Sequence, residues 1–175
     1  MTAKKLPKVQ EFRVQKVEHE SDGLTRPLFD VNLKRFKNVP AYRNIVISVI
    51  AYMRNLLMLY EFSNYSKLAG ISGANVGVPW NIVLVKDRND KCLTMINPSV
   101  VGMSEGKITV KSNCGSLCIT KKIDVGRREW VEVLYYDVKG NPQKERFAVE
   151  DKGCTIQHEI DHNRGVLIVD FDKHL

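Results

Sequence analysis

The sequence predicts an α+β fold in which antiparallel strands surround a C-terminal helix and one long amphipathic helix lies near the N-terminus. Three observations support this fold class. Residues 40–60 have helical periodicity, residues 81–149 contain strand-like segments separated by turns, and a second helical segment lies near the end of the chain. Because strands and helices do not alternate through the middle of the chain, a parallel βαβ sheet is not expected.

The composition indicates a single globular domain with a substantial core. The chain has 175 residues, of which 43% are hydrophobic and 27% are charged. No apolar run approaches the roughly 20 residues that span a bilayer, and the N-terminus has no apolar signal core, so no membrane partner is expected. We divide the chain into a basic N-terminal arm, residues 1–38, and a folded domain, residues 39–175.

Charge and cysteine content indicate the partners and the compartment. The net charge of +7 would suit an anionic partner, but the basic residues are scattered, so no specific nucleic-acid site is expected. Four cysteines without a secretory signal indicate free thiols in a reducing, intracellular compartment. Cys114 and Cys118 have no second pair at zinc-finger spacing, which disfavours a structural zinc site.

The long helix is predicted to begin at Pro40, a residue that suits a first helical turn. Its apolar residues recur at three- and four-residue spacing and form one stripe that should face the core. The stripe consists of Ile45, Val46, Val49, Ile50, Met53, Leu56, Leu57 and Tyr60. The polar residues 61–67 predict a loop after it.

A glycine-rich segment, residues 70–77, follows this loop. Glycines at this density permit positive φ angles and close approach of the backbone to another group. The segment is not a phosphate-binding loop, because no Lys-Ser or Lys-Thr pair follows it. Beyond it, residues 81–86 and 92–96 are extended and predict a hairpin with a turn at residues 87–90.

The remaining strands and the last helix are predicted from alternation and turn residues. Residues 107–113 alternate like a strand, and residues 130–137 pair with residues 143–149 through a strong turn at 139–142. Glu150 or Asp151 is expected to cap the last helix, which should stop at Gly165.

The last helix carries a His-Glu-x-x-His motif at residues 158–162. Residues four apart lie on the same helix face, so His158 and His162 can bind one metal ion. Glu159 lies beside them, where it can take a proton from a water molecule on the metal. The alternative, two histidines without a metal, is disfavoured by the intervening glutamate.

A catalytic site of this kind needs a third protein ligand. In zinc proteases with the same motif the third ligand lies well downstream, whereas only thirteen residues follow His162. Asp170, Asp172 and His174 are the plausible ligands among them. A conventional zinc protease is therefore disfavoured, and the third ligand should come from upstream.

Several segments, in order and spacing over residues 40–170, resemble the signatures of the peptide deformylase family. Residues 157–162 with Gly165 are similar to its third signature, and residues 70–77 are similar to its first, Gly-Leu-Ala-Ala-x-Gln-Val-Gly. Residues 96–98 match its Ile-Asn-Pro. Residues 114–118, Cys-Gly-Ser-Leu-Cys, fall where the family has Glu-Gly-Cys-Leu-Ser, and Arg127 also matches in spacing.

The resemblance implies an enzyme that removes the formyl group from the N-terminal formyl-methionine of nascent polypeptides. It implies a divalent metal ion, Fe²⁺ or Zn²⁺, with His158 and His162 as ligands and Glu159 as the general base. Ser116 falls at the position of the family's third ligand, a cysteine. The side chain of Asn75 and the N–H of Leu117 fall where the family stabilises the oxyanion.

The resemblance also implies substrate-binding positions in the glycine-rich segment and around the cysteine motif. These are Gly70, Ser72, Gly73, Cys114, Gly115 and Arg127.

Three departures from the family pattern bear most directly on catalysis. Ser116, Asn75 and Cys114 replace the family's Cys, Gln and Glu, respectively. A neutral serine hydroxyl in place of a thiolate should weaken metal binding. Cys114 and Cys118 each lie two residues, about 6.5 Å of extended chain, from Ser116. Either cysteine could replace the missing ligand only through a bulge or a register change, and this alternative stays open.

Two functions follow. The first is a metal-dependent amide hydrolase of the deformylase type that acts on nascent polypeptide N-termini. The second is a catalytically impaired homologue that binds peptide N-termini or the ribosome without turnover.

Overall fold

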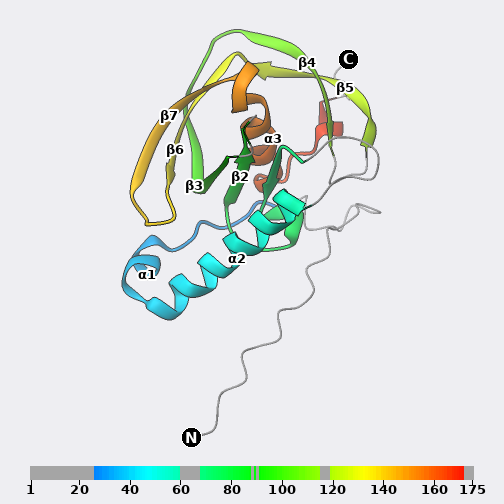
Figure 1. Cartoon of the computed structure of the whole chain (residues 1–175). Coiled ribbons are helices and arrows are strands. Elements are labelled where there is room, and N and C mark those ends of the chain that lie inside the picture. The colour runs from blue at the N-terminus through cyan, green and yellow to red at the C-terminus, as the bar shows by residue number, and fades with distance from the viewer. Residues whose placement is uncertain (1–25, 60–67, 88, 90, 115–118, 172–175) are drawn as a thin grey trace, which may run out of the picture.

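The computed structural model describes residues 26–59, 68–87, 89, 91–114 and 119–171. It confirms the predicted α+β fold: antiparallel strands surround the C-terminal helix, and a long helix lies outside them (Figure 1). The predicted loop at residues 61–67 and most of the predicted arm, residues 1–25, lie outside the described residues. No helix in the described part of the chain is both long enough and apolar enough to span a bilayer.

Two helices precede the strands. The short helix α1, Leu33–Asn38, begins where the Asn32 side chain accepts a hydrogen bond from the Arg35 backbone N–H at 2.9 Å. Phe36 on α1 and Val31 before it are buried in the core, so residues 26–38 pack with the domain. The long helix α2, Pro40–Leu59, has the predicted position and buries most of its apolar stripe. Ile45 is 56% exposed, so its predicted place facing the core is wrong, and Tyr60 lies outside the described residues.

The larger sheet has five strands in the order β1-β2-β3-β6-β7, all antiparallel. Their bounds are β1 Gly70–Ser72, β2 Ile82–Lys86, β3 Cys92–Met103, β6 Trp130–Tyr136 and β7 Pro142–Ala148. Both predicted hairpins, β2–β3 and β6–β7, are confirmed. Strand β1 at the sheet edge was not predicted from the sequence.

Helices α2 and α3 (Cys154–Asn163) pack on opposite faces of this sheet. Ile82 and Leu84 of β2 lie in the cluster with α2, whereas Val83 and Val85 lie in the cluster with Ile156 of α3. Successive side chains of a strand point to opposite faces, so β2 is apolar throughout because both faces are buried. The sheet thus holds α3 from one side.

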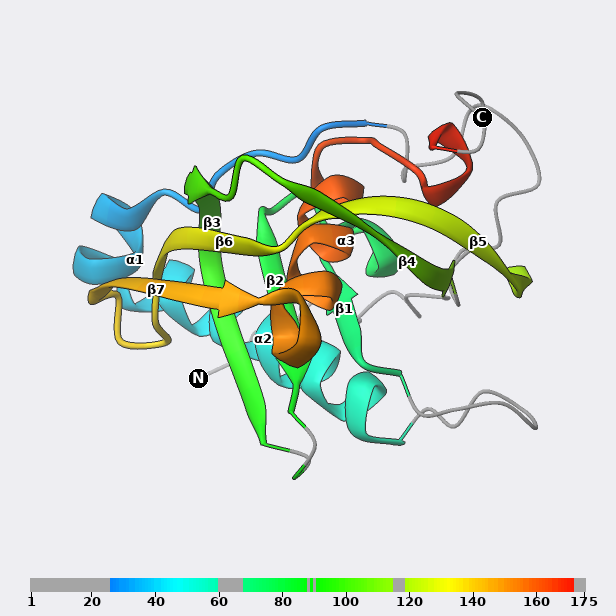
Figure 2. The same ribbon diagram turned by 90° about the horizontal axis from the view of Figure 1, so that it is seen from above.

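The smaller sheet is a hairpin of β4, Lys107–Cys114, and β5, Ile119–Arg128. It crosses α3 on the side away from α2 (Figure 2). Its pairing is regular from Lys107 to Ser112 and then shifts, since Ser112 pairs with Ile123 but Cys114 pairs with Ile119. Such an irregularity changes the direction in which the next side chain points.

The start of α3 differs from the prediction. A π-helical turn, Val149–Gly153, precedes the helix, and no side chain caps either segment. Glu150 and Asp151 lie within this turn, so the prediction that one of them caps the helix is wrong. Their charges lie in the first turn, where they interact favourably with the helix dipole.

The end of α3 follows the prediction. Gly165 has a φ of 77°, Gly165 N donates to His162 O at 3.0 Å, and Val166 N donates to Asp161 O at 2.9 Å. These two bonds and the left-handed glycine form a Schellman motif, which ends a helix.

Candidate metal centre

Helix α3 presents both histidines on the same side. The Nε2 atoms of His158 and His162 are 3.1 Å apart, and the rings lie edge to face with centroids 4.5 Å apart. Ile156 and Ile160, on the other side of the helix, are buried against the large sheet. The sheet therefore fixes the rotation of α3 that turns the two rings toward β4.

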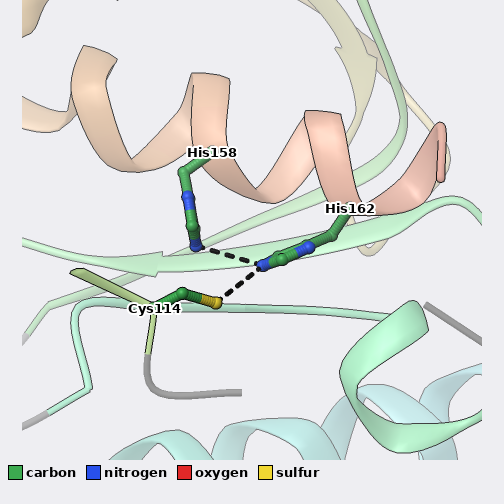
Figure 3. Close-up of side chains that lie close together, drawn as sticks. All are labelled: Cys114, His158 and His162. Atoms are coloured by element: carbon green, nitrogen blue, oxygen red, sulfur yellow. Dashed lines mark hydrogen bonds between the residues drawn. The ribbon is translucent and has the colours of Figure 1, made fainter. Parts of the chain in front are cut away.

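Cys114, the last residue of β4, meets the two rings. Its Sγ lies 3.4 Å from His162 Nε2, and its side chain is fully buried (Figure 3). Cys114, His158 and His162 offer one sulfur and two nitrogen atoms within 4.8 Å of one another. Within the described ranges, no other group of this kind is found.

These distances fit a tetrahedral metal ion. With metal–nitrogen bonds of about 2.05 Å and a metal–sulfur bond of about 2.3 Å, tetrahedral angles put the two nitrogens about 3.3 Å apart and sulfur about 3.6 Å from each nitrogen. The observed separations of 3.1 and 3.4 Å are slightly shorter. One thiol and two imidazoles are a donor set that suits zinc or ferrous iron.

A register shift in the β4–β5 hairpin directly precedes Cys114. The shift lies between Ser112 and Cys114. An irregularity of this kind is what a cysteine near Ser116 would need in order to replace Ser116 as the third ligand. Ser116 itself lies outside the described residues, as do Gly115, Leu117 and Cys118. Its role as a ligand stays a prediction.

The sequence contained a signal for Cys114. Aligned on Glu-Gly-Cys-Leu-Ser in the predicted register, residues 114–118 match the glycine and the leucine. Shifted by two residues, Cys114 and Ser116 match the cysteine and the serine instead. Both registers give two identities, so only ligand chemistry distinguishes them, and a thiolate is the better ligand.

Burial keeps both histidine rings neutral. It lowers the pKa of His162 to about 4, and the Arg127 charge contributes to the shift. It also lowers the pKa of His158 well below its usual value, with the neighbouring His162 and Arg127 adding to the effect. A metal ion binds neutral imidazole, so both rings are in the binding form at neutral pH.

Glu159 is buried beside the three ligands. Burial raises its pKa to about 8, although the neighbouring Ser72 side chain acts in the opposite direction. Among the described residues its Oε2 has no hydrogen-bond partner. A Cβ atom at Gly70 would lie 2.9 Å from Glu159 Cγ and 3.0 Å from Oε1, so only glycine leaves room for this carboxylate.

Asn75 lies on the 3₁₀ turn η2, Ala74–Val76, close to α3. Its side-chain oxygen accepts hydrogen bonds from Ser72 N at 2.7 Å and Ser72 Oγ at 2.8 Å. Ser72 is fully buried, and Asn75 is 5% exposed. Gly73 permits a close approach as well, since a Cβ there would lie 2.2 Å from the Trp80 carbonyl oxygen.

Arg127 pairs with a carboxylate that the sequence did not suggest. Its Nη1 donates to Asp161 Oδ2 at 2.5 Å, its side chain is 3% exposed, and its guanidinium lies 5.0 Å from the Phe171 ring centroid. Its Nε and Nη2 have no hydrogen-bond partner within the described residues. Asp161 lies inside the His-Glu-x-x-His motif. A carboxylate at that position was the one sequence feature that could have suggested a partner for Arg127.

Gln157 on α3 and Asp170 beyond it make hydrogen bonds to the backbone. Gln157 accepts from Arg128 N at 2.9 Å and donates to Arg128 O at 3.0 Å, which joins α3 to β5. Asp170, a candidate ligand downstream, instead accepts from Leu167 N at 2.8 Å. Asp172 and His174, the other downstream candidates, lie outside the described residues.

Comparison with known proteins identifies the family of this chain. The sequence model of the polypeptide deformylase family matches residues 27–174. A peptide deformylase from Synechocystis is 38% identical over 105 residues, 58% of this chain and 55% of that protein. One from Pseudothermotoga lettingae is 30% identical over 137 residues, 78% of this chain and 74% of that protein.

A solved structure has the same fold. The Met-Ala-Ser-bound class I type b peptide deformylase from Acinetobacter baumannii superposes with a TM-score of 0.71 at 21% identity, covering 91% of this chain and 97% of that one. This chain spans about half the length, 55%, of the first curated relatives it matches. On the match of the family model over residues 27–174, the chain belongs to the polypeptide deformylase family.

Proposed function

We propose that this protein is a metal-dependent hydrolase that removes the formyl group from N-terminal formyl-methionine of nascent polypeptides. The observation that carries the proposal is the meeting of Cys114, His158 and His162 beside the buried Glu159. The family supports the reaction class. A divalent ion held by these three residues, ferrous iron or zinc, would polarise a water molecule and the formyl carbonyl.

Cys114 takes the ligand role that the sequence prediction gave to Ser116. A cysteine thiolate is charged and soft, so the predicted weakening of metal binding no longer applies. If Cys114 holds the position of the family's cysteine, the next backbone N–H is that of Gly115. We therefore propose the Gly115 N–H, in place of the Leu117 N–H, as one oxyanion donor.

Glu159 acts as the general base and then as the general acid. It accepts a proton from the attacking water and passes it to the amine nitrogen that leaves as the new N-terminus. Its burial excludes bulk water from this proton, and Gly70 leaves the carboxylate free to lie against β1. The Asn75 side chain is the second proposed oxyanion donor.

The proposed partner is the N-terminus of a nascent chain, encountered as it leaves the ribosome. Formylated N-termini occur in bacteria, mitochondria and plastids, so the protein should act in one of these compartments. The Acinetobacter neighbour was solved with Met-Ala-Ser, which has the form of a deformylated product. A formyl-Met-Ala-Ser peptide is accordingly the probe of choice.

The test is formate release from formyl-Met-Ala-Ser by protein purified without oxygen and loaded with Fe²⁺ or, separately, Zn²⁺. We expect turnover that a chelator abolishes and metal restores, and no turnover of the acetylated peptide at a comparable rate. Metal binding and peptide binding without formate release would contradict hydrolysis and favour the alternative, a homologue that binds peptide N-termini.

A further inference from the structure

Ser72 contacts both the proposed base and the proposed oxyanion donor. Its hydroxyl and backbone N–H both donate to Asn75 Oδ1, at 2.8 and 2.7 Å, and its side chain also neighbours Glu159. A serine hydroxyl carries one proton, and here that proton is donated to Asn75 Oδ1. Ser72 thus connects α3 to η2 through one buried side chain.

The backbone bond fixes which end of the Asn75 carboxamide faces β1. A backbone N–H can only donate, so the atom 2.7 Å from Ser72 N is the oxygen of the carboxamide and not its nitrogen. The Nδ2 end must therefore be directed away from Ser72. Only that end can donate a hydrogen bond to an oxyanion.

The position of Ser72 itself is well held. β1 pairs with β2, with Ser72 opposite Val83, and Gly73 N donates to Ile82 O at 2.9 Å just after it. The side chain is fully buried. A donor pair on such a strand has little freedom to move, so its hydrogen bonds can fix the orientation of a neighbouring side chain.

Ser72 and Asn75 both depart from the family's first signature. In Gly-Leu-Ala-Ala-x-Gln, alanine stands at the position of Ser72 and glutamine at that of Asn75. Asparagine is one methylene shorter than glutamine, and alanine has no hydroxyl. The two side chains contact each other directly. Serine at 72 is longer than the family's alanine, and it reaches the amide of Asn75, which is shorter than the family's glutamine.

We propose that Ser72 is a positioning residue that fixes the Asn75 carboxamide for oxyanion stabilisation, and that this pair replaces the alanine and glutamine of the family. The proposal rests on the proposed deformylase function. It changes the predicted role of Ser72 from contact with substrate to orientation of Asn75.

The test compares Ser72→Ala, Asn75→Gln and the double variant, which restores the family pair. Loss of one hydrogen bond to the carboxamide should lower kcat about tenfold in Ser72→Ala, with little change in KM. Asn75→Gln alone should lose at least as much, because the longer side chain meets the Ser72 hydroxyl. The double variant should recover kcat to within a few-fold of the wild type.

Metal content and melting temperature are measured for every variant, and exposed Ser99→Ala on β3 is the matched control. A purely structural role would lower kcat and stability together and would give no recovery in the double variant. Losses in the single variants that multiply in the double variant would overturn the pairing, and so would an unchanged kcat in Ser72→Ala.

A second readout separates this proposal from the proposed function. If the wild type releases no formate, the function fails, and the Asn75 side-chain NH₂ resonances of the wild type and Ser72→Ala are compared by NMR. We expect them to shift and to exchange faster with water when the hydroxyl is removed. Unchanged resonances would overturn the positioning role whether or not the protein is an enzyme.

Discussion

The two parts of the protein that supply the candidate ligands are held in different ways. α3 carries His158 and His162, buries Ile156 and Ile160 against a five-stranded sheet and is joined to β5 through Gln157. Cys114 lies at the end of a two-stranded hairpin, just after a shift in register. The helix side depends on one continuous motif, whereas the strand side depends on how two strands pair.

The largest expected effect concerns the base on the helix side. Glu159→Gln keeps the size of the side chain and removes the proton acceptor, so kcat should fall about 10²- to 10⁴-fold. The three ligands are unchanged, so metal content should stay the same. Formate release and metal analysis are measured on the same samples. A variant that loses its metal as well would show that Glu159 acts on binding and not on proton transfer.

The next effect compares the packing of the two sides. Ile156 on α3 is fully buried, so Ile156→Ala should lower the free energy of unfolding by about 2–5 kcal/mol. Val110 on β4 is only partly buried, and Val110→Ala should cost about 1–2 kcal/mol. Urea unfolding measures both. Equal losses would mean that the hairpin is held as firmly as the helix.

A smaller effect comes from the buried carboxyl of Glu159 in metal-free protein. Its pKa is about 8 in the folded state and 4.5 in the unfolded state. Between pH 4.5 and pH 8 the folded state therefore binds more protons than the unfolded state. Stability from this group is therefore present below pH 4.5 and is lost as pH rises toward 8. The free energy of unfolding of metal-free Glu159→Gln should exceed that of the metal-free wild type by on the order of 4 kcal/mol at pH 8.

The difference between these two proteins should vanish near pH 4, and urea unfolding in a chelator at pH 4, 6 and 8 measures it. The shifted histidines contribute equally to both proteins and cancel in the comparison. A difference that does not depend on pH would mean that Glu159 is already ionised in the folded, metal-free protein.

The smallest expected effect concerns the joint between the two sides. Gln157→Ala removes both hydrogen bonds to Arg128 and should cost about 1–3 kcal/mol. Gln157→Glu is the matched control: it retains the acceptor for Arg128 N and loses only the donor to Arg128 O. If α3 and β5 are joined here, Gln157→Ala should also weaken metal binding, which a titration would measure.

The helix side could be predicted from the sequence because its information is local. The i, i+4 spacing of His158 and His162 defines one helix face, and Gly165 marks the helix end that the structure confirms. The sequence also shows Glu159 and Asp161 between the two histidines. The pairing of Asp161 with Arg127 was not visible in the sequence, since it needs α3 to cross β5.

The strand side could not be predicted because its information is not local. Residues 114–118 match the family motif equally well in two registers, and a two-residue slip changes which side chain reaches the metal. The shift between Ser112 and Cys114 is a property of two paired strands. The helix cap failed for a similar reason, because the π-helical turn before Cys154 depends on how β7 ends.

The most direct test is the metal content of Cys114→Ala beside Ser116→Ala, each purified without oxygen and loaded with Fe²⁺ or Zn²⁺. With Cys114, His158 and His162 as the ligands, Cys114→Ala should lose the metal and formate release with it. Ser116→Ala should bind about one equivalent, as the wild type does. Full metal content in Cys114→Ala, with loss in Ser116→Ala, would contradict the Cys114 site and restore the register first predicted.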